Sequence, residues 1–153
     1  MHNVNTTTIL IVDDEPFNIT LLSDLLSDKY RILVATNGLQ ALKRVNTSQP
    51  DLILLDIMMP EMDGYEVCRQ LKADDRTKDV PVIFLSAKGL SREVDKGFRC
   101  GPIVVDYLVK PISTDGLTDR VEAILSSSQE RGLETLREES LAQFVEVKQR
   151  LWA

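Results

Sequence analysis

Short apolar runs, each followed by a polar or charged residue, recur between residues 9 and 109. Such runs are typical of strands that are covered on both faces, as in a parallel sheet. We expect five strands, over residues 9–12, 31–35, 52–55, 80–85 and 103–109. The run at 52–55 leads directly into Asp56, which places that carboxylate at the carboxyl edge of the expected sheet.

Helical patterns separate these runs. Pro16 suits the first turn of a helix with apolar residues at 21, 22, 25 and 26. Further helices are expected over 39–45, over 66–72 with a start near Gly64 or Tyr65, over 91–99, and after a cap at Ser113 or Thr114. Five strands alternating with five helices predict an α/β fold, a doubly wound five-stranded parallel sheet with helices on both faces. We expect the flavodoxin-like strand order 2-1-3-4-5.

Two connecting segments carry signals of their own. Pro60 removes a backbone donor and Gly64 permits positive φ, so residues 57–63 are expected to form a shaped loop. Residues 73–79 are highly charged, and we interpret them as a solvated loop.

The last stretch of the chain follows a different pattern. Ser126 to Gln129 is interpreted as a weak linker, and apolar residues from Leu133 to Leu151 follow helical spacing. An amphipathic helix must bury its apolar stripe, so this one could fold back, dimerise or lead into a further domain. We divide the chain into a domain over 7–126 and a C-terminal helix over 127–153. Of the three possibilities, we slightly prefer that this helix connects the domain to an output domain.

Composition narrows the function. A net charge of −6 and a pI near 4.8 argue against direct binding of nucleic acid. The two cysteines form no spaced motif, no signal peptide is seen, and no stretch has the apolar length of a membrane helix, which favours the cytoplasm. The sole histidine, His2, lies near the start of the chain. This position argues against a histidine kinase or phosphotransfer domain, because such a domain needs a phosphorylated histidine on a helix.

Polar side chains follow four of the expected strands. Asp13 and Asp14 follow the first, Asp56 the third, Ser86 the fourth and Lys110 the fifth. In the expected strand order these residues converge at one edge of the sheet. Crowded carboxylates repel one another, and a divalent cation such as Mg²⁺ relieves that repulsion. Because carboxylates also attack phosphoryl donors, the set predicts an incomplete Mg²⁺ site with one carboxylate free as nucleophile.

Four segments in this order resemble the receiver domain of bacterial two-component response regulators. They are Ile-Leu-Ile-Val-Asp-Asp-Glu-Pro at 9–16, Leu-Asp-Ile-Met-Met-Pro-Glu-Met-Asp-Gly-Tyr-Glu at 55–66, Leu-Ser-Ala at 85–87 and Asp-Tyr-Leu-Val-Lys-Pro at 106–111. The resemblance covers about residues 7 to 126. It implies that Asp56 is the phosphoacceptor, that Asp14 binds Mg²⁺ directly and Asp13 partly through water, and that the carbonyl of Met58 is a further ligand.

The resemblance also implies a switch and its partners. Ser86 would hydrogen-bond the phosphoryl group, Lys110 would pair with it, and Tyr107 would turn inward when Ser86 moves. The Lys110–Pro111 bond would be cis. The phosphoryl donor would be a histidine kinase or a phosphotransfer protein, and the switched surface could support a homodimer.

One segment departs from the family pattern. Between Gly101 and Asp106 the chain is two residues longer than the usual Gly-Ala-x-Asp-Tyr, and the extra residues enter the fifth strand. Because both flanking motifs are intact, we expect Ser86 and Lys110 to keep their relative placement.

Other interpretations remain at this point. Each polar residue alone has a simpler explanation. The acids Asp13 and Asp14 could cap a helix, and Ser86 could be a strand-end hydroxyl. Lys110 could be a solvated charge, and Tyr107 a half-buried core ring. A Mg²⁺-dependent phosphatase could use the same chemistry, but Met58 stands where its general acid would lie. A receiver-like module that only binds proteins is disfavoured by the complete set of acids.

Overall fold

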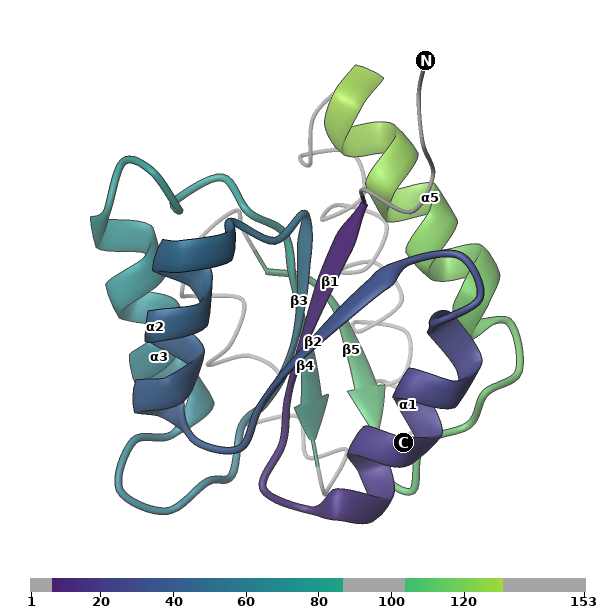
Figure 1. Ribbon diagram of the computed structural model, residues 1–153, viewed down its shortest axis with the longest axis horizontal. Helices are drawn as coiled ribbons and strands as arrows, with labels where there is room; N and C mark the ends of the chain where they lie inside the picture. Colours follow the sequence, from purple (N-terminus) through teal and green to yellow (C-terminus); the bar gives the residue numbers. More distant parts are fainter. Residues whose placement is uncertain (1–6, 87–103, 131–153) are drawn as a thin grey trace, which may run out of the picture.

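The computed structural model describes residues 7–86 and 104–130 (Figure 1). The helix expected over 91–99 and the C-terminal helix beyond Glu130 lie outside the described residues. Within the part of the chain that the structure describes, no helix is long and apolar enough to cross a membrane.

Five parallel strands form a single sheet in the order β2-β1-β3-β4-β5, which confirms the expected fold class and strand order. The central position of β3 gives it a neighbour on each side, and all five of its residues are buried. The strands are β1 (Thr8–Val12), β2 (Arg31–Ala35), β3 (Leu52–Asp56), β4 (Val82–Ser86) and β5 (Val104–Val109).

Four helices are described, two on each face of the sheet (Figure 1). Local chemistry explains where they begin: Pro16 opens α1, and the side chains of Asn37 and Asp63 cap α2 and α3 by accepting from backbone amides three residues on. The helices are α1 (Pro16–Leu26), α2 (Gly38–Ser48), α3 (Gly64–Ala73) and α5 (Leu117–Glu130).

The core has two layers because alternate strand residues point to opposite faces. Leu10, Ile53 and Phe84 pack on the side of α2 and α3. Ile9, Leu54 and Ile83 pack on the side of α1 and α5. Each of these six residues is fully buried, so the strands are held rigidly and their carboxyl ends have fixed positions.

A bulge in β5 accommodates part of the extra length before Asp106. Val82 of β4 lies opposite Val104, but the next residue, Ile83, lies opposite Asp106, so the register passes over Val105. The bulge shifts the alternation by one residue: Val105 packs with the α1/α5 core, and Tyr107 then packs with the α2/α3 core. Tyr107 therefore lies beside Phe84, with ring centroids 5.5 Å apart.

Two local predictions were wrong at the ends of helices. The α5 helix begins at Leu117, later than a cap at Ser113 or Thr114 implies, and the hydroxyl of Ser113 instead accepts from the amide of Asp115. The α5 helix continues to Glu130, so the expected linker from Ser126 to Gln129 is helical. The division of the chain near residue 126 stays a prediction.

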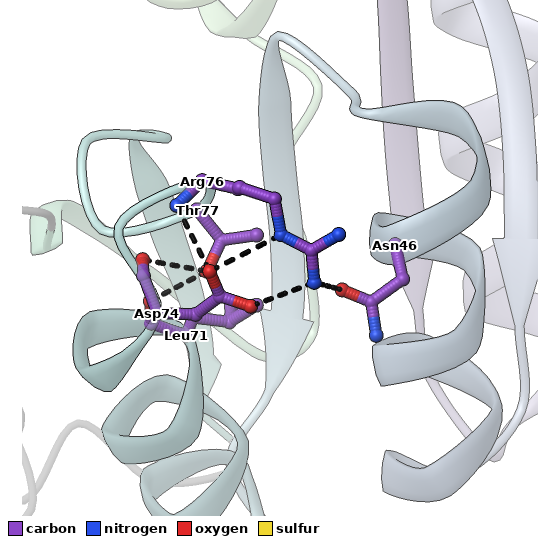
Figure 2. A network of polar contacts seen from close by, with 5 residues as sticks. All are labelled: Asn46, Leu71, Asp74, Arg76 and Thr77. Atoms are coloured by element: carbon purple, nitrogen blue, oxygen red, sulfur yellow. Dashed lines mark hydrogen bonds and ion pairs between the residues drawn. The ribbon is translucent and has the colours of Figure 1, made fainter.

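The charged segment after α3 is more ordered than a solvated loop. Figure 2 shows how Arg76 contacts Asp74 and the side chain of Asn46 on α2, while Thr77 donates to the carbonyl of Leu71 at 2.6 Å. Thr77 is only 3% exposed, so a polar residue of the predicted loop is in fact an internal anchor. We refer to these five residues as the α3–β4 network.

Candidate functional site

The predicted acids and lysine meet at the carboxyl ends of the strands. Asp13 follows β1 and is 0% exposed, Asp56 ends β3 and is 1% exposed, and the side chain of Lys110 after β5 is 10% exposed. The ammonium of Lys110 lies 3.1 Å from Oδ2 of Asp13 and 3.2 Å from Oδ2 of Asp56. The structure therefore brings together three residues that stand far apart in the sequence.

These two buried carboxylates are incompletely satisfied. Within the described residues, neither Oδ2 accepts a hydrogen bond of good geometry, although each is in ion-pair contact with Lys110. The other oxygens have backbone partners: Oδ1 of Asp13 accepts from the amide of Glu15 at 2.9 Å, and Oδ1 of Asp56 accepts from the amide of Met58 at 3.2 Å. Buried polar atoms are normally paired, so the two Oδ2 atoms indicate a place for a further positively charged group.

Burial first, and then the neighbouring Asp13 carboxylate, raise the pKa of Asp56 to about 7, against the opposing effects of Lys110 and the Met58 amide. Burial lowers the pKa of Lys110, but its contacts with Asp13 and the charge of Asp56 outweigh burial and raise that pKa overall. The two residues thus share one electrostatic environment, in which two acids compete for one ammonium.

Two further acids, Asp14 and Glu15, belong to this cluster. Carboxylate oxygens of Asp13, Asp14 and Glu15 lie within 4.8 Å of one another, and Oε1 of Glu15 lies 3.5 Å from the ammonium of Lys110. The sequence pattern assigned no role to Glu15, because an acid just before a helix is equally well explained as a cap. Its place in the acidic run at 13–15 was the only signal. We refer to Asp13, Asp14, Glu15, Asp56 and Lys110 as the acidic site.

The remaining predicted residues surround the acidic site in different ways. Ser86 is fully buried at the end of β4, and its carbonyl accepts from the Lys110 amide at 2.6 Å. The Met58 side chain is 59% exposed, and its contact with the site is through the backbone amide. Tyr107 is half-buried against Phe84. The Lys110–Pro111 bond is cis, as expected.

Gly64 lies directly behind Asp56, and its role differs from the one predicted. Positive φ occurs at Glu61 in this loop, not at Gly64. A Cβ at Gly64 would lie 2.5 Å from the carbonyl oxygen of Asp56 and 2.9 Å from Cα of Ile57. The amide of Gly64 also donates to the carbonyl of Ile57 at 2.9 Å, so the start of α3 lies against the end of β3. The glycine is needed for space between two backbones.

Comparison with known proteins identifies the class of this fold and site. The family model of the response regulator receiver domain matches residues 9–122. The chain therefore belongs to the response regulator receiver domain family, and the receiver domain is a phosphorylation switch of two-component systems rather than an enzyme. A receiver domain implies a cognate histidine kinase as partner.

Individual relatives share the domain but are longer. The chain is 42% identical over 133 residues to a probable cyclic di-GMP phosphodiesterase of Vibrio cholerae, which covers 87% of this chain and 30% of that protein. It is 42% identical over 124 residues to the alkaline phosphatase synthesis transcriptional regulatory protein PhoP of Bacillus subtilis, covering 79% of this chain and 49% of the relative. The chain thus spans half or less of the length of these curated relatives.

A solved structure with the same fold contains a metal ion. The receiver domain of a sensor histidine kinase from Pseudomonas aeruginosa PAO1 has a magnesium ion coordinated in its active site cleft. That structure is 30% identical to this chain, with a TM-score of 0.71, and the match covers 79% of this chain and 98% of the other.

Proposed function

We propose that Asp56 accepts a phosphoryl group from a phosphohistidine of a histidine kinase or phosphotransfer protein. The observation that carries this proposal is the buried Asp56 carboxylate, whose Oδ2 accepts no good hydrogen bond from the described residues and lies 3.2 Å from the Lys110 ammonium. Family membership supports the same reaction. An oxygen of Asp56 attacks phosphorus, the P–N bond to the imidazole breaks as the new P–O bond forms, and the imidazole leaves with the electron pair.

Magnesium fits the donors that the acidic site provides. Mg²⁺ prefers oxygen ligands and keeps several waters, and this site has carboxylates on one side and an exposed rim at Asp14 and Glu15. We assign the metal to the carboxylates of Asp13, Asp14 and Asp56 and the carbonyl of Met58. The magnesium in the Pseudomonas receiver supports this assignment. When bound, the cation neutralises charge on the transferring phosphoryl oxygens.

The other residues of this chain position the phosphoryl group and read its presence. Lys110 pairs with a phosphoryl oxygen, which replaces part of its contact with the Asp56 carboxylate. Ser86 is buried at the end of β4, and its hydroxyl donates a hydrogen bond to the same phosphoryl group. Tyr107 is the switch residue, since it shares an aromatic contact with Phe84, two residues before Ser86. The added charge of about −1.5 to −2 shifts a surface between two states.

The output of the switch acts through protein contacts. The switched surface supports a homodimer or a further protein partner, and residues 127–153 serve as a connector to an output domain. The acidic net charge of −6 disfavours direct contact of this chain with nucleic acid. We propose that the protein acts in the cytoplasm. The relatives carry different outputs, a cyclic di-GMP phosphodiesterase and a transcriptional regulator, so similarity to them leaves the output open.

Labelling with a small phosphodonor such as acetyl phosphate, or with BeF₃⁻ as a phosphoryl mimic, tests the phosphoacceptor. Intact-mass measurement should show one phosphoryl group on the wild type in the presence of Mg²⁺ and none on Asp56→Asn. The matched control is Asp75→Asn, because that side chain is 94% exposed and remote from the site. Equal labelling of Asp56→Asn would refute the assignment.

Two further measurements test the alternative functions. Sustained turnover of a phosphomonoester would favour a phosphatase, and no Mg²⁺ binding at millimolar concentration would favour a module that only binds proteins.

A further inference from the structure

We propose that Glu15 is a positioning residue that holds the Lys110 ammonium while a divalent cation occupies the carboxylates of Asp13 and Asp56. This inference rests on the proposed function of the acidic site. It concerns how one lysine is shared between the resting site and the metal-bound site.

Glu15 occupies the N-cap position of α1 but does not cap the helix with its side chain. Its backbone is extended, with φ −99° and ψ 115°, and its side chain makes no capping hydrogen bond. In the first turn of α1, the backbone carbonyl of Glu15 accepts hydrogen bonds from the amides of Asn18 and Ile19. The carboxylate is therefore available for another partner, and Oε1 lies 3.5 Å from the Lys110 ammonium.

The backbone of Glu15 is tied to a buried acid of the site. Its amide donates to Oδ1 of Asp13 at 2.9 Å, which fixes the distance between the two residues at the start of α1. Asp13 is fully buried, while the Glu15 side chain is 62% exposed. The two carboxylates consequently hold Lys110 from different sides, one from the interior and one from the rim.

This asymmetry determines where Lys110 can go. Its two closer partners, Asp13 and Asp56, are the acids that a divalent cation needs. Once the cation binds them, it repels the ammonium at short range. Among the described residues, Glu15 is the carboxylate in contact with Lys110 that lies outside this buried pair. A small shift toward the rim keeps Lys110 paired and close enough to return to a phosphoryl oxygen.

Removal of Glu15 should therefore strengthen the competition between Lys110 and the metal. Without the rim carboxylate, Asp13 and Asp56 are the acids that remain in contact with the ammonium in the described part of the chain. We expect Glu15→Gln to weaken Mg²⁺ binding about threefold to tenfold, as titration calorimetry of the full chain measures it. The matched control Asp28→Asn removes the same charge from an exposed position just after the far end of α1, and should change the affinity less than about twofold.

A double-mutant cycle separates action through Lys110 from direct attraction of the cation. In a Lys110→Met background the further change Glu15→Gln should alter Mg²⁺ affinity less than about twofold. An equal loss in both backgrounds would overturn the inference, because Glu15 would then act on the cation itself.

A third variant tests the inference without any change at Lys110. Glu15→Asp keeps the charge but shortens the side chain by one methylene, so the contact with Lys110 is lost. We expect Glu15→Asp to bind Mg²⁺ as weakly as Glu15→Gln, while both variants keep the wild-type melting temperature. Wild-type affinity in Glu15→Asp would overturn the inference. Failure of the wild type itself to bind Mg²⁺ would instead contradict the proposed metal site.

Discussion

The acidic site and the α3–β4 network lie at opposite ends of the parallel strands, and they satisfy their polar atoms to very different degrees. In the network, Arg76 contacts both Asp74 and Asn46, and the Thr77 hydroxyl donates to the Leu71 carbonyl (Figure 2). In the acidic site, Oδ2 atoms of two buried aspartates share one ammonium and have no good hydrogen bond among the described residues.

The difference shows which group serves the fold and which serves a reaction. The network surrounds one buried hydroxyl with partners and leaves its charges at the surface, as expected for a segment that only has to be stable. The acidic site buries carboxylates with too few partners, which costs stability. Such an arrangement is typical of functional sites, where a ligand supplies the missing charge.

The largest expected effect is a gain of stability on removal of the central acid. Asp56→Asn removes a buried charge and leaves Lys110 paired with Asp13 and Glu15, so the free energy of unfolding at pH 8 without metal should rise by about 2–4 kcal/mol. Urea denaturation measures this change. Asp75→Asn, at a position 94% exposed, should leave the stability unchanged. A loss of stability in Asp56→Asn would mean that the acidic site serves the fold as the network does.

The pH dependence of the wild type should reveal the same acid. The pKa of Asp56 is raised to about 7 in the folded protein, whereas an aspartate in the unfolded chain ionises near ~4. Between these values the folded state binds more protons, so metal-free stability should fall as pH rises, by up to about 1.4 kcal/mol per pH unit, and level off above about pH 7. Denaturation from pH 4 to 9 tests this. This fall in stability with pH should be absent in Asp56→Asn. A wild-type profile that matched the profile of the variant would contradict the raised pKa of Asp56.

A smaller and opposite effect is expected in the network. Thr77→Val keeps the shape of the side chain but removes the donor to the Leu71 carbonyl, which should lower the free energy of unfolding by about 1–2 kcal/mol. Chemical denaturation measures this loss. The control is Thr47→Val, which removes a hydroxyl at an exposed position, so the difference between the two variants is the additional effect of burial. Equal losses in the two variants would show that Thr77 is not an internal anchor.

The smallest effect concerns the charges of the network. Arg76→Ala removes the contacts with Asp74 and Asn46, but the Arg76 side chain is largely exposed to water, where ion pairs contribute little. We expect a change in the melting temperature within the error of calorimetry, and no change in phosphoryl labelling. A clear loss of either would mean that the α3–β4 network is coupled to the acidic site.

Much of this arrangement could be predicted from the sequence because it depends on local patterns. The apolar runs gave the strands to within about two residues, and the polar residues at strand ends gave Asp13, Asp56 and Lys110 as neighbours once the strand order was assumed. Gly64 was noticed for the wrong reason, since the space it needs is visible only when β3 and α3 are placed together. The order of residues 74–77 was missed because charge alone does not show which hydroxyl is buried.

The amino-acid sequence alone determined which described segments are strands and which are helices, and their order. A strand covered on both faces needs a continuous apolar run, and a helix that is covered on one side needs apolar residues at helical spacing. Contacts between distant residues required the folded structure. The bulge at Val105, which directs Tyr107 toward Phe84, depends on pairing with β4. The contact of Glu15 with Lys110 depends on where two separate strand ends lie in space, and no local pattern records that distance.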